Sequence, residues 1–466
     1  MNKLRLRLTY IFFDLLSASI VWMLFVHFRR ATIVQVSFGT QEEIPFPTID
    51  IQIGLLLFLL LCLFVYFLSG IYLNPEKHRQ FRVFGKTLVA TGIISVIVFF
   101  ALVVADVRLI THYHEAFLAL WGMLLGTTYF FRFIICYIRR KNYKTGKWTI
   151  RTAIIGTGEN AQKIAQEIAK NMPENTLIGF IADDKNAKKT NILGEFSQID
   201  KLIESENIHE IIIALDDTDE NRLFSIINAL YSHNIVIRFM PRLYEILIGG
   251  VKIQNLEISP LVTVTSLSMS DWEACVKRFF DIAVSFFALL LLLPFFAIMA
   301  IRIKMDSKGS VFFSQERIGQ FGKPFNILKF RTMYENAENG TPQLSTASDS
   351  RVTRFGKFLR KHRLDELPQF WNVLIGEMSI VGPRPERQFY INKISEIAPY
   401  YCLLYKIRPG LTSWGPIRIG YSDTIEKMVE RLNYDIIYLD NMSLITDFKI
   451  LLYTIEVIFK GKEFRI

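Results

Sequence analysis

Four long apolar runs dominate the first part of the chain, at residues 8–28, 51–70, 86–105 and 115–138. Each run is close to the roughly 20 residues that a helix needs to cross a bilayer. The first run has no small-residue cleavage site and is followed by further runs, which argues against a removed signal peptide. The pattern predicts a bundle of four membrane-spanning helices over residues 1–147.

The basic residues of the short loops predict how this bundle is oriented. Lysines and arginines gather before the first run, between the second and third runs, and after the fourth. The other two loops hold only Arg29, Arg30 and Arg108. Because positive loops stay on the cytoplasmic side, both ends of the bundle are predicted to be cytoplasmic.

From about residue 150 the pattern changes to short β-branched runs that alternate with helical periodicity. This alternation predicts a parallel sheet with helices on both faces, a Rossmann-like cytoplasmic module over residues 148–265. The expected strands are 150–155, 177–181, 208–214 and 235–240, and the expected helices are 160–171, 197–205 and 219–232.

The first of these strands runs into the sequence GTGENA at residues 156–161. A GxGxxA turn that opens a helix is one place where a dinucleotide pyrophosphate binds. Glycines at such a turn also serve backbone geometry alone, and Glu159 would repel a phosphate there. A bound cofactor and a structural or regulatory module both remain open for residues 148–265.

A fifth apolar run covers residues 279–301 and contains Pro294. Basic residues flank both of its ends, so neither end favours the outside, and an internal proline favours a kink. A hairpin that enters and leaves the membrane on the cytoplasmic side satisfies both features. A straight fifth span, which would place residues 302–466 outside the cell, is the alternative.

Composition agrees with a membrane protein. The 466 residues are 51% hydrophobic and 21% charged, which excludes a disordered chain and is too apolar for an ordinary soluble enzyme. The net charge of +10 divides into +9 for residues 1–148, −7 for 149–273 and +8 for 274–466. Since the basic excess accompanies the apolar runs, a membrane surface is favoured over nucleic acid as the partner. The four cysteines are scattered and show neither metal-type pairing nor a disulfide framework.

The densest polar pattern lies between residues 312 and 415, around the adjacent carboxylates Asp365 and Glu366. Pro368 favours a helix start just after the pair. Many arginines and lysines surround the pair in sequence, and Arg384 and Arg408 are framed by prolines that restrict the backbone. Two carboxylates among fixed cations indicate Mg²⁺ and a phosphorylated substrate. Contact of basic residues with anionic lipid headgroups is the alternative for several of the cations.

Several motifs occur together and in order. They are KRFFDIAVS (277–285), FSQERIG (313–319), FNILKFRTM (325–333), DSRVTRFGKFLRKHRLDELPQFWNVLIGEMSIVGPRPE (349–386), RPGLTSW (408–414) and NYDIIYLDNMSLITDFKILLYT (433–454). In these motifs residues 274–466 closely resemble the bacterial sugar transferase family, the monotopic polyprenyl-phosphate phosphoglycosyl transferases that initiate exopolysaccharide and O-antigen repeat units. The resemblance implies an α-rich catalytic domain with a re-entrant membrane hairpin at 279–301. It also implies transfer of a sugar 1-phosphate from a UDP-sugar to undecaprenyl phosphate with release of UMP.

The resemblance also implies roles for individual residues. Asp365 would be the nucleophile that forms a covalent phosphosugar intermediate, and Glu366 would help to hold Mg²⁺ with it. The expected diphosphate contacts are Lys329, Arg331, Arg384 and Arg408, together with Arg317. Asp435 and Tyr438 would either orient an arginine or be purely structural. Lys277, Arg278 and Asp281 would anchor the start of the hairpin, and Pro294 would kink it.

The resemblance further implies a location and partners. UDP-sugars are cytoplasmic, so the catalytic domain is expected on the cytoplasmic face of the bacterial inner membrane, in contact with lipid and as a homodimer. One departure from the family is the run SWGP at 413–416. A membrane-anchored NAD-linked dehydratase is an alternative, but its Tyr-x-x-x-Lys pair is missing where Tyr244 is followed by Ile248. A scaffold with a silent transferase domain is another, against which the intact carboxylate pair argues.

Overall fold

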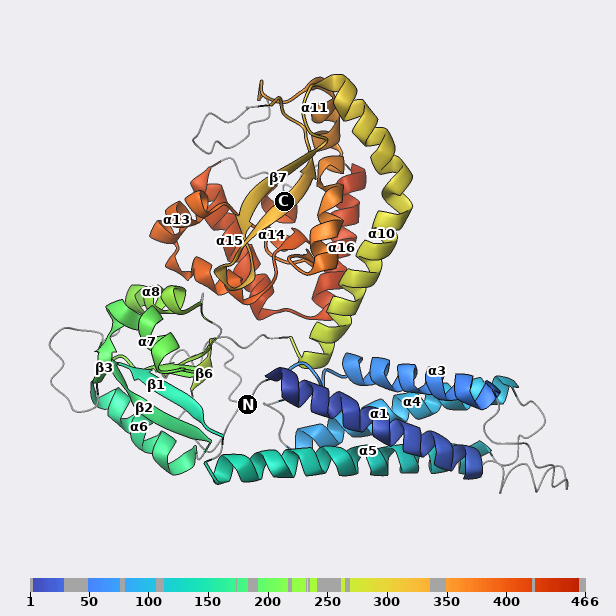
Figure 1. The fold of residues 1–466 in the computed structure, drawn as a ribbon. Helices are drawn as coiled ribbons and strands as arrows, with labels where there is room; N and C mark the ends of the chain where they lie inside the picture. Colours follow the sequence, from blue (N-terminus) through green and yellow to red (C-terminus); the bar gives the residue numbers. More distant parts are fainter. Residues whose placement is uncertain are drawn as a thin grey trace. The chain divides into compact units, whose positions relative to one another are not determined.

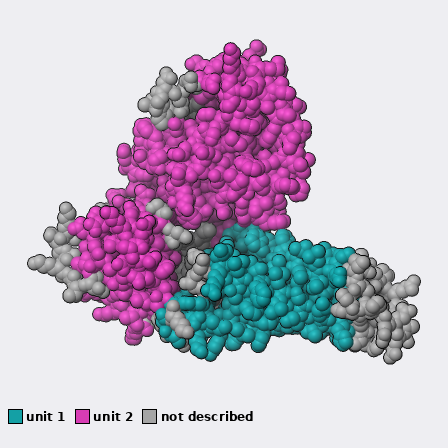
Figure 2. All heavy atoms as spheres, in the orientation of Figure 1, with its two compact units in different colours: residues 1–148, 270–276 teal, residues 149–269, 277–466 magenta. Residues whose placement is uncertain are grey.

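The chain is described from a computed structural model, in which two compact units can be distinguished (Figure 2). One unit comprises residues 1–148 and 270–276, and the other comprises residues 149–269 and 277–466. The described residues are 3–28, 49–75, 80–105, 113–146, 148–172, 174–182, 192–216, 220–231, 233, 235–240, 261–264, 269–335, 349–420 and 424–460.

The first unit contains four long helices, α1 (Lys3–Phe28), α3 (Ile49–Leu68), α4 (Gln80–Ala105) and α5 (Tyr113–Lys144) (Figure 1). All four are long and apolar enough to cross a membrane. Most of their apolar side chains point outward, since at most 39% of any of the four apolar windows is buried. So much exposed apolar surface is typical of helices that face lipid, which makes this a membrane protein. The loop residues Arg29, Arg30 and Arg108, on which the predicted orientation rests, lie outside the described residues.

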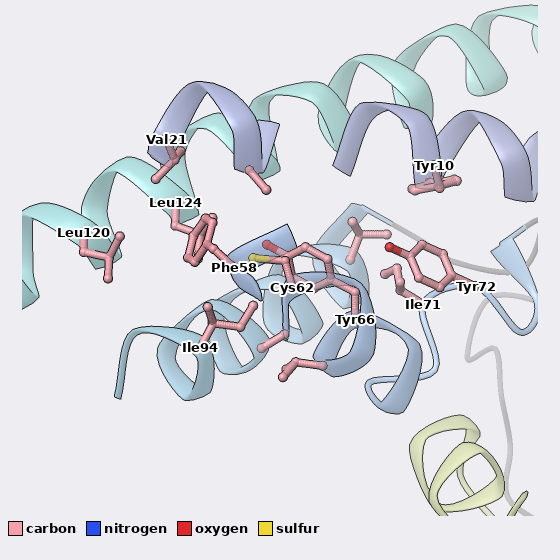
Figure 3. Packing of buried hydrophobic residues seen from close by; sticks show 14 of the residues in the cluster. Tyr10, Val21, Phe58, Cys62, Tyr66, Ile71, Tyr72, Ile94, Leu120 and Leu124 are labelled. Carbon is pink, nitrogen blue, oxygen red and sulfur yellow. The ribbon is translucent and has the colours of Figure 1, made fainter. Parts of the chain in front are cut away.

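Aromatic and aliphatic side chains fill the interior of this helical unit, among them Tyr10, Phe58 and Leu124 (Figure 3). A buried ion pair lies in the same interior. The Arg132 guanidinium donates to both Asp14 carboxylate oxygens, over 2.9 and 2.8 Å. Its third nitrogen donates to the Thr87 hydroxyl at 2.8 Å, and Tyr72 donates to Asp14 at 2.6 Å. Since a buried charge without a partner is costly, this network links α1, α4 and α5 in one arrangement.

The sheet of the second unit has the strand order β3-β2-β1-β4-β5-β6, and all its neighbours are parallel except β5 and β6. The strands are β1 (Ile150–Ile155), β2 (Asn175–Ala182), β3 (Ile192–Glu195), β4 (Glu210–Ile213), β5 (Val236–Phe239) and β6 (Val262–Thr263). Helices α6 (Glu159–Asn171), α7 (Ile199–Ser205) and α8 (Glu220–Tyr231) accompany the strands. The predicted parallel α/β sheet is confirmed. The sequence missed β3 and β6, because strands of four and two residues carry little periodic signal. Tyr244 and Ile248 lie outside the described residues.

The rest of the second unit packs short helices around two small sheets. Antiparallel strands β7 (Phe312–Ile318) and β8 (Pro324–Phe330) form a hairpin, and β9 (Ser379–Val381) pairs in parallel with β10 (Gly410–Thr412). The other elements are α11 (Arg354–Lys361), η6 (Leu364–Gln369), α12 (Phe370–Ile375), α13 (Gln388–Ile397), η7 (Pro399–Lys406), α14 (Trp414–Ile419), α15 (Ile425–Asp440) and α16 (Leu444–Lys460). Figure 1 shows α14, α15 and α16 grouped beside the β7–β8 hairpin.

The fifth apolar run lies in α10 (Asp271–Asp306), a continuous helix with Pro294 inside it. Figure 1 shows α10 curving along the helices of the second unit. Near its start, Arg278 donates to the carbonyls of Val373 and Leu374, and at its end the Asp306 carboxylate accepts from the Phe355 amide. The start of α10 thus contacts α12 and its end contacts α11, while the middle of the apolar run is exposed, with Leu291 76% exposed.

Candidate functional site

The carboxylate pair lies in the short helical segment η6, just after α11. Thr353 caps the start of α11, where its hydroxyl accepts from the Gly356 amide at 3.0 Å. After α11 the chain turns at Arg363, whose φ of 53° is in the left-handed region that few non-glycine residues adopt. This turn directs Asp365 and Glu366 inward from the first turn of η6. Such strained positions cluster at functional sites, and this one lies two residues before Asp365.

Glu366 is held by two cations from different parts of the chain. Its Oε1 accepts from Lys329 Nζ at 3.1 Å and from Arg384 at 2.9 Å. Burial alone would raise the pKa of this carboxyl, but Lys329 and Arg384 outweigh that effect and hold the pKa well below its usual range. Glu366 is therefore a fixed negative charge. Burial in turn lowers the pKa of the Lys329 ammonium, which Glu366 opposes.

Asp365 differs from its neighbour. It is 9% exposed, and within the described part of the chain no hydrogen bond or ion pair holds its carboxylate. Burial, followed by the adjacent Glu366, raises the pKa of Asp365, while Lys329, Arg360 and Arg384 oppose the rise. A carboxylate that has lost water and gained no hydrogen bond is poorly stabilised, which favours reaction with an electrophile.

The structure brings two of the five predicted diphosphate contacts, Lys329 and Arg384, to the carboxylate pair. The other three have partners elsewhere. Arg331 donates to the Ser307 carbonyl at 2.6 Å, Arg408 donates to the Gly376 carbonyl at 2.8 Å, and Arg317 donates to Glu386 at 3.2 Å.

Asp435 and Tyr438 are buried, and among the described residues neither forms a hydrogen bond with Asp365 or Glu366. The Tyr438 hydroxyl donates to Asp447 Oδ1 at 2.6 Å, and Lys277 donates to Oδ2 of the same carboxylate at 2.5 Å. Asp435 is 2% exposed beside Ser413 and Arg431, and burial raises its pKa to about 7. These contacts favour the structural alternative for Tyr438.

The residues at the start of α10 bond to protein groups. Lys277 also donates to the Val381 carbonyl at 2.9 Å. The Asp281 carboxylate accepts from the Ser379 hydroxyl at 2.8 Å and from the Ile380 amide at 3.0 Å. The polar groups that the sequence assigns to the membrane interface thus attach α10 to strand β9.

Sequence reasoning did not place Arg360, Glu386 and Arg431 in the site. Arg360 contributes to the field at Asp365 and donates to the Thr332 hydroxyl at 2.8 Å. Glu386 lies two residues after the proline-framed Arg384, and Arg431 lies one helical turn before Asp435. Those two spacings are the signals that could have found them.

A pocket adjoins Arg384 on the side of β10. Its lining combines two cations, hydroxyl groups and apolar side chains: Arg363, Arg384, Gly410, Leu411, Thr412, Ser413, Pro416, Ile417, Thr454 and Val457. The Ser413 and Pro416 of the unusual SWGP run line this pocket, so the departure from the family pattern lies next to the candidate site.

Comparison with known proteins identifies the family of the chain. The model of the bacterial sugar transferase family matches residues 272–461. A UDP-glucose:undecaprenyl-phosphate glucose-1-phosphate transferase of Caulobacter vibrioides is 40% identical over 38% of this chain and 68% of its own length. The chain belongs to the bacterial sugar transferase family.

Two further relatives of this sugar transferase align over longer stretches. A UDP-N-acetylgalactosamine-undecaprenyl-phosphate N-acetylgalactosaminephosphotransferase of Aeromonas hydrophila is 37% identical over 49% of this chain and 53% of its own length. A UDP-glucose:undecaprenyl-phosphate glucose-1-phosphate transferase of Escherichia coli (strain K12) is 33% identical over 61% of each chain. The alignments thus span little more than half of these two relatives.

The carboxylate pair of this sugar transferase suits a magnesium ion. Mg²⁺ prefers oxygen ligands and is commonly held by one or two carboxylates together with substrate phosphates. Among the residues that the structure describes, no three His, Cys, Asp or Glu side chains gather into a metal site. Asp365 and Glu366 could hold an ion whose other ligands come from substrate and water.

The model of a CoA-binding domain matches residues 68–241 of the sugar transferase, which include the GTGENA turn. At this turn the amides of Glu159 and Asn160 donate to the Asp216 carboxylate at 3.1 and 3.0 Å. A Cβ placed on Gly158 would lie 1.1 Å from Asp216 Oδ2. The side chain of Asp216 thus occupies the position where a helix N-terminus receives a phosphate. While Asp216 holds these amides, the residues of the turn do not fit a pyrophosphate.

Proposed function

We propose that the chain transfers a sugar 1-phosphate from a UDP-sugar to undecaprenyl phosphate, releasing UMP. The observation that carries the proposal is the contrast between two adjacent carboxylates, the buried Asp365 and the partly buried Glu366. Asp365 has no hydrogen bond or ion pair among the described residues, whereas Glu366 is held by Lys329 and Arg384. The names of the relatives, which are transferases acting on UDP-sugars and undecaprenyl phosphate, support the same reaction.

In the first half of the proposed reaction, an Asp365 oxygen attacks the phosphorus that carries the sugar. A new oxygen–phosphorus bond forms, and the bond from this phosphorus to the bridging oxygen breaks, so UMP leaves with the electron pair. In the second half, a phosphate oxygen of undecaprenyl phosphate attacks the same phosphorus. The bond to Asp365 breaks, which restores the carboxylate and gives undecaprenyl-diphosphate-sugar. This is a ping-pong scheme with a covalent intermediate.

The charges around the pair suit a diphosphate substrate. Lys329 and Arg384 fix Glu366, and together with Arg360 they supply a positive field at Asp365. Preorganised cations stabilise the charge that develops on a transferring phosphoryl group. Mg²⁺ held by Asp365 and Glu366 would offset the charge on the departing UMP.

The proposed acceptor is a membrane lipid, which requires the site to lie at headgroup depth. Because the start of α10 contacts α12 and its end contacts α11, the two helices that flank η6, we propose that residues 279–301 enter and leave on the cytoplasmic face of the bacterial inner membrane. Labelling of single cysteines tests this path. Residues beyond 305 that react only from the periplasmic side would contradict it.

The reaction is tested by incubating the purified chain with undecaprenyl phosphate, Mg²⁺ and a panel of UDP-sugars. We expect UMP release with at least one UDP-sugar, and the productive sugar identifies the donor. Release of UDP instead of UMP would contradict transfer of a sugar 1-phosphate. Light scattering on the same preparation tests the homodimer implied by the family resemblance.

A further inference from the structure

A cluster of buried charged side chains lies around the segment that carries Arg384. Glu386 is 4% exposed and Arg431 is 6% exposed, and Arg317 and Asp435 complete the cluster. The members come from β7, from the turn before α13 and from α15, so the cluster joins three separate stretches of sequence. Among the described contacts none of the four touches Asp365 or Glu366.

Glu386 is the centre of this cluster. One of its carboxylate oxygens accepts from Arg317 at 3.2 Å, and the other accepts from Arg431. The same Arg317 nitrogen also donates to the Pro385 carbonyl at 3.1 Å. Arg317 from β7 and Arg431 from α15 thus both bind Glu386, and Arg317 also binds the peptide group between Pro385 and Glu386.

The backbone on both sides of Arg384 is fixed as well. The Ile318 amide donates to the Glu386 carbonyl at 3.0 Å, and the Gly410 amide donates to the Pro383 carbonyl at 2.8 Å. Pro383 and Pro385 fix their own φ angles and restrict their neighbours. Arg384 extends from this rigid turn and reaches Glu366 at 2.9 Å.

We infer that Glu386 is a positioning residue for Arg384. Glu386 is bound by Arg317 and Arg431, and it holds the 383–386 turn so that the Arg384 guanidinium reaches Glu366 and the donor diphosphate. The inference rests on the proposed function for the role of the diphosphate. Glu386 itself touches neither carboxylate of the catalytic pair.

The physical reason is that the two arginines need this carboxylate in order to stay buried. Burial lowers the pKa of Arg317, and Glu386 opposes that effect. If Glu386 lost its charge, the buried Arg431 and the partly buried Arg317 would lack their shared partner, and the 383–386 turn would shift toward solvent. A displacement of about 1 Å at a positioning group can cost about 100-fold in rate.

A double-mutant cycle tests this role. We expect Glu386→Gln to lower kcat/KM for UMP release at least 10-fold when Arg384 is present. In an Arg384→Ala background the same change should cost less than 3-fold, because the group that Glu386 positions is already gone. Glu210→Gln is the matched control, since Glu210 is also buried and paired with an arginine, Arg238, but lies in the parallel sheet. It should leave kcat/KM unchanged.

Two results would overturn the inference. One is unchanged activity of Glu386→Gln. The other is that the losses in kcat/KM from Glu386→Gln and Arg384→Ala multiply in the double variant, which is the result that general destabilisation would give. The same cycle read on the Kd for UDP separates this inference from the proposed function, because binding a diphosphate through Arg384 requires no transfer. Suppose that the wild type binds UDP, that the effects of Glu386→Gln and Arg384→Ala on the Kd are coupled, and that no UMP is released. The proposed function then fails and the positioning role of Glu386 stands. Additive effects of the two substitutions on the Kd would reject the positioning role.

Discussion

Replacement of Glu366 by glutamine tests whether its charge, paired with Lys329 and Arg384, supports both the stability and the activity of the chain. The change keeps the shape of the side chain and removes the charge that faces Lys329 and Arg384. At 3.1 Å for Lys329 and 2.9 Å for Arg384, each pair is worth about 5–6 kcal/mol of attraction at an effective dielectric constant of about 20, before the cost of removing the charges from water. Removing one partner of a buried pair typically costs about 3–5 kcal/mol in the free energy of unfolding, and the partial exposure of Glu366 (14%), Lys329 (18%) and Arg384 (30%) places this site near the lower value, about 3 kcal/mol. We therefore expect Glu366→Gln to lower stability by about that amount and to lower activity and its response to Mg²⁺ together.

The stability that Glu366 contributes should decrease as pH falls. The folded pKa of Glu366 lies well below its usual range, so its contribution to stability is complete above the unfolded pKa of about 4.3 and is lost as pH falls through the folded value. The wild type and Glu366→Gln should therefore differ fully at pH 7 and converge only in strong acid. Thermal unfolding between pH 3 and pH 8, together with Mg²⁺ titrations of UMP release, measures both effects.

The matched control is Glu316→Gln, an exposed glutamate on the β7–β8 hairpin, which should change stability by less than about 0.5 kcal/mol. The reasoning would be refuted if Glu366→Gln melted with the wild type across this range and kept its Mg²⁺ titration.

Three further predictions concern other parts of the chain. Burial raises the pKa of Asp435 to about 7, so the free energy of unfolding should decline as pH rises from about 4 through 7. Asp435→Asn should flatten this decline in thermal unfolding. An unchanged slope in the variant would contradict the raised pKa of Asp435. Asp14→Asn leaves the Arg132 charge without its carboxylate and should cost about 3–5 kcal/mol, seen as a lower melting temperature in detergent; melting at the wild-type temperature would show that the pair is not needed. Asp216→Ala frees two amides at the start of α6 and should bind inorganic pyrophosphate more tightly than the wild type in calorimetry; equal affinity would mean that Asp216 does not occupy an anion position.

The sequence predicted those parts of the fold whose signals are local. The isoleucine-rich runs that became β1 and β4 are buried on both faces of a parallel sheet, so their composition alone marks them. The four long apolar helices follow from hydropathy in the same way. Arg384 could be predicted because prolines on both sides mark a fixed turn.

Contacts between distant residues could not be predicted in this way. Asp14 and Arg132 are 118 positions apart in the sequence. Each is a single charge within an apolar run, and the sequence does not show that the two charges pair with each other. Arg331 follows the last residue of β8, so strand alternation does not set its direction, and it turns to Ser307. Arg408 meets a carbonyl at Gly376, whose φ of 97° ends α12 in a conformation that the sequence alone does not specify.

The central claim is that Asp365 carries the phosphosugar between donor and acceptor, and mass spectrometry tests it directly. The chain is mixed with its UDP-sugar in the absence of undecaprenyl phosphate, quenched and digested. The account predicts one equivalent of UMP released and one phosphosugar adduct on the peptide that contains Asp365, with neither product in Asp365→Asn. An adduct on another residue, or UMP release that requires undecaprenyl phosphate and leaves no adduct, would contradict it.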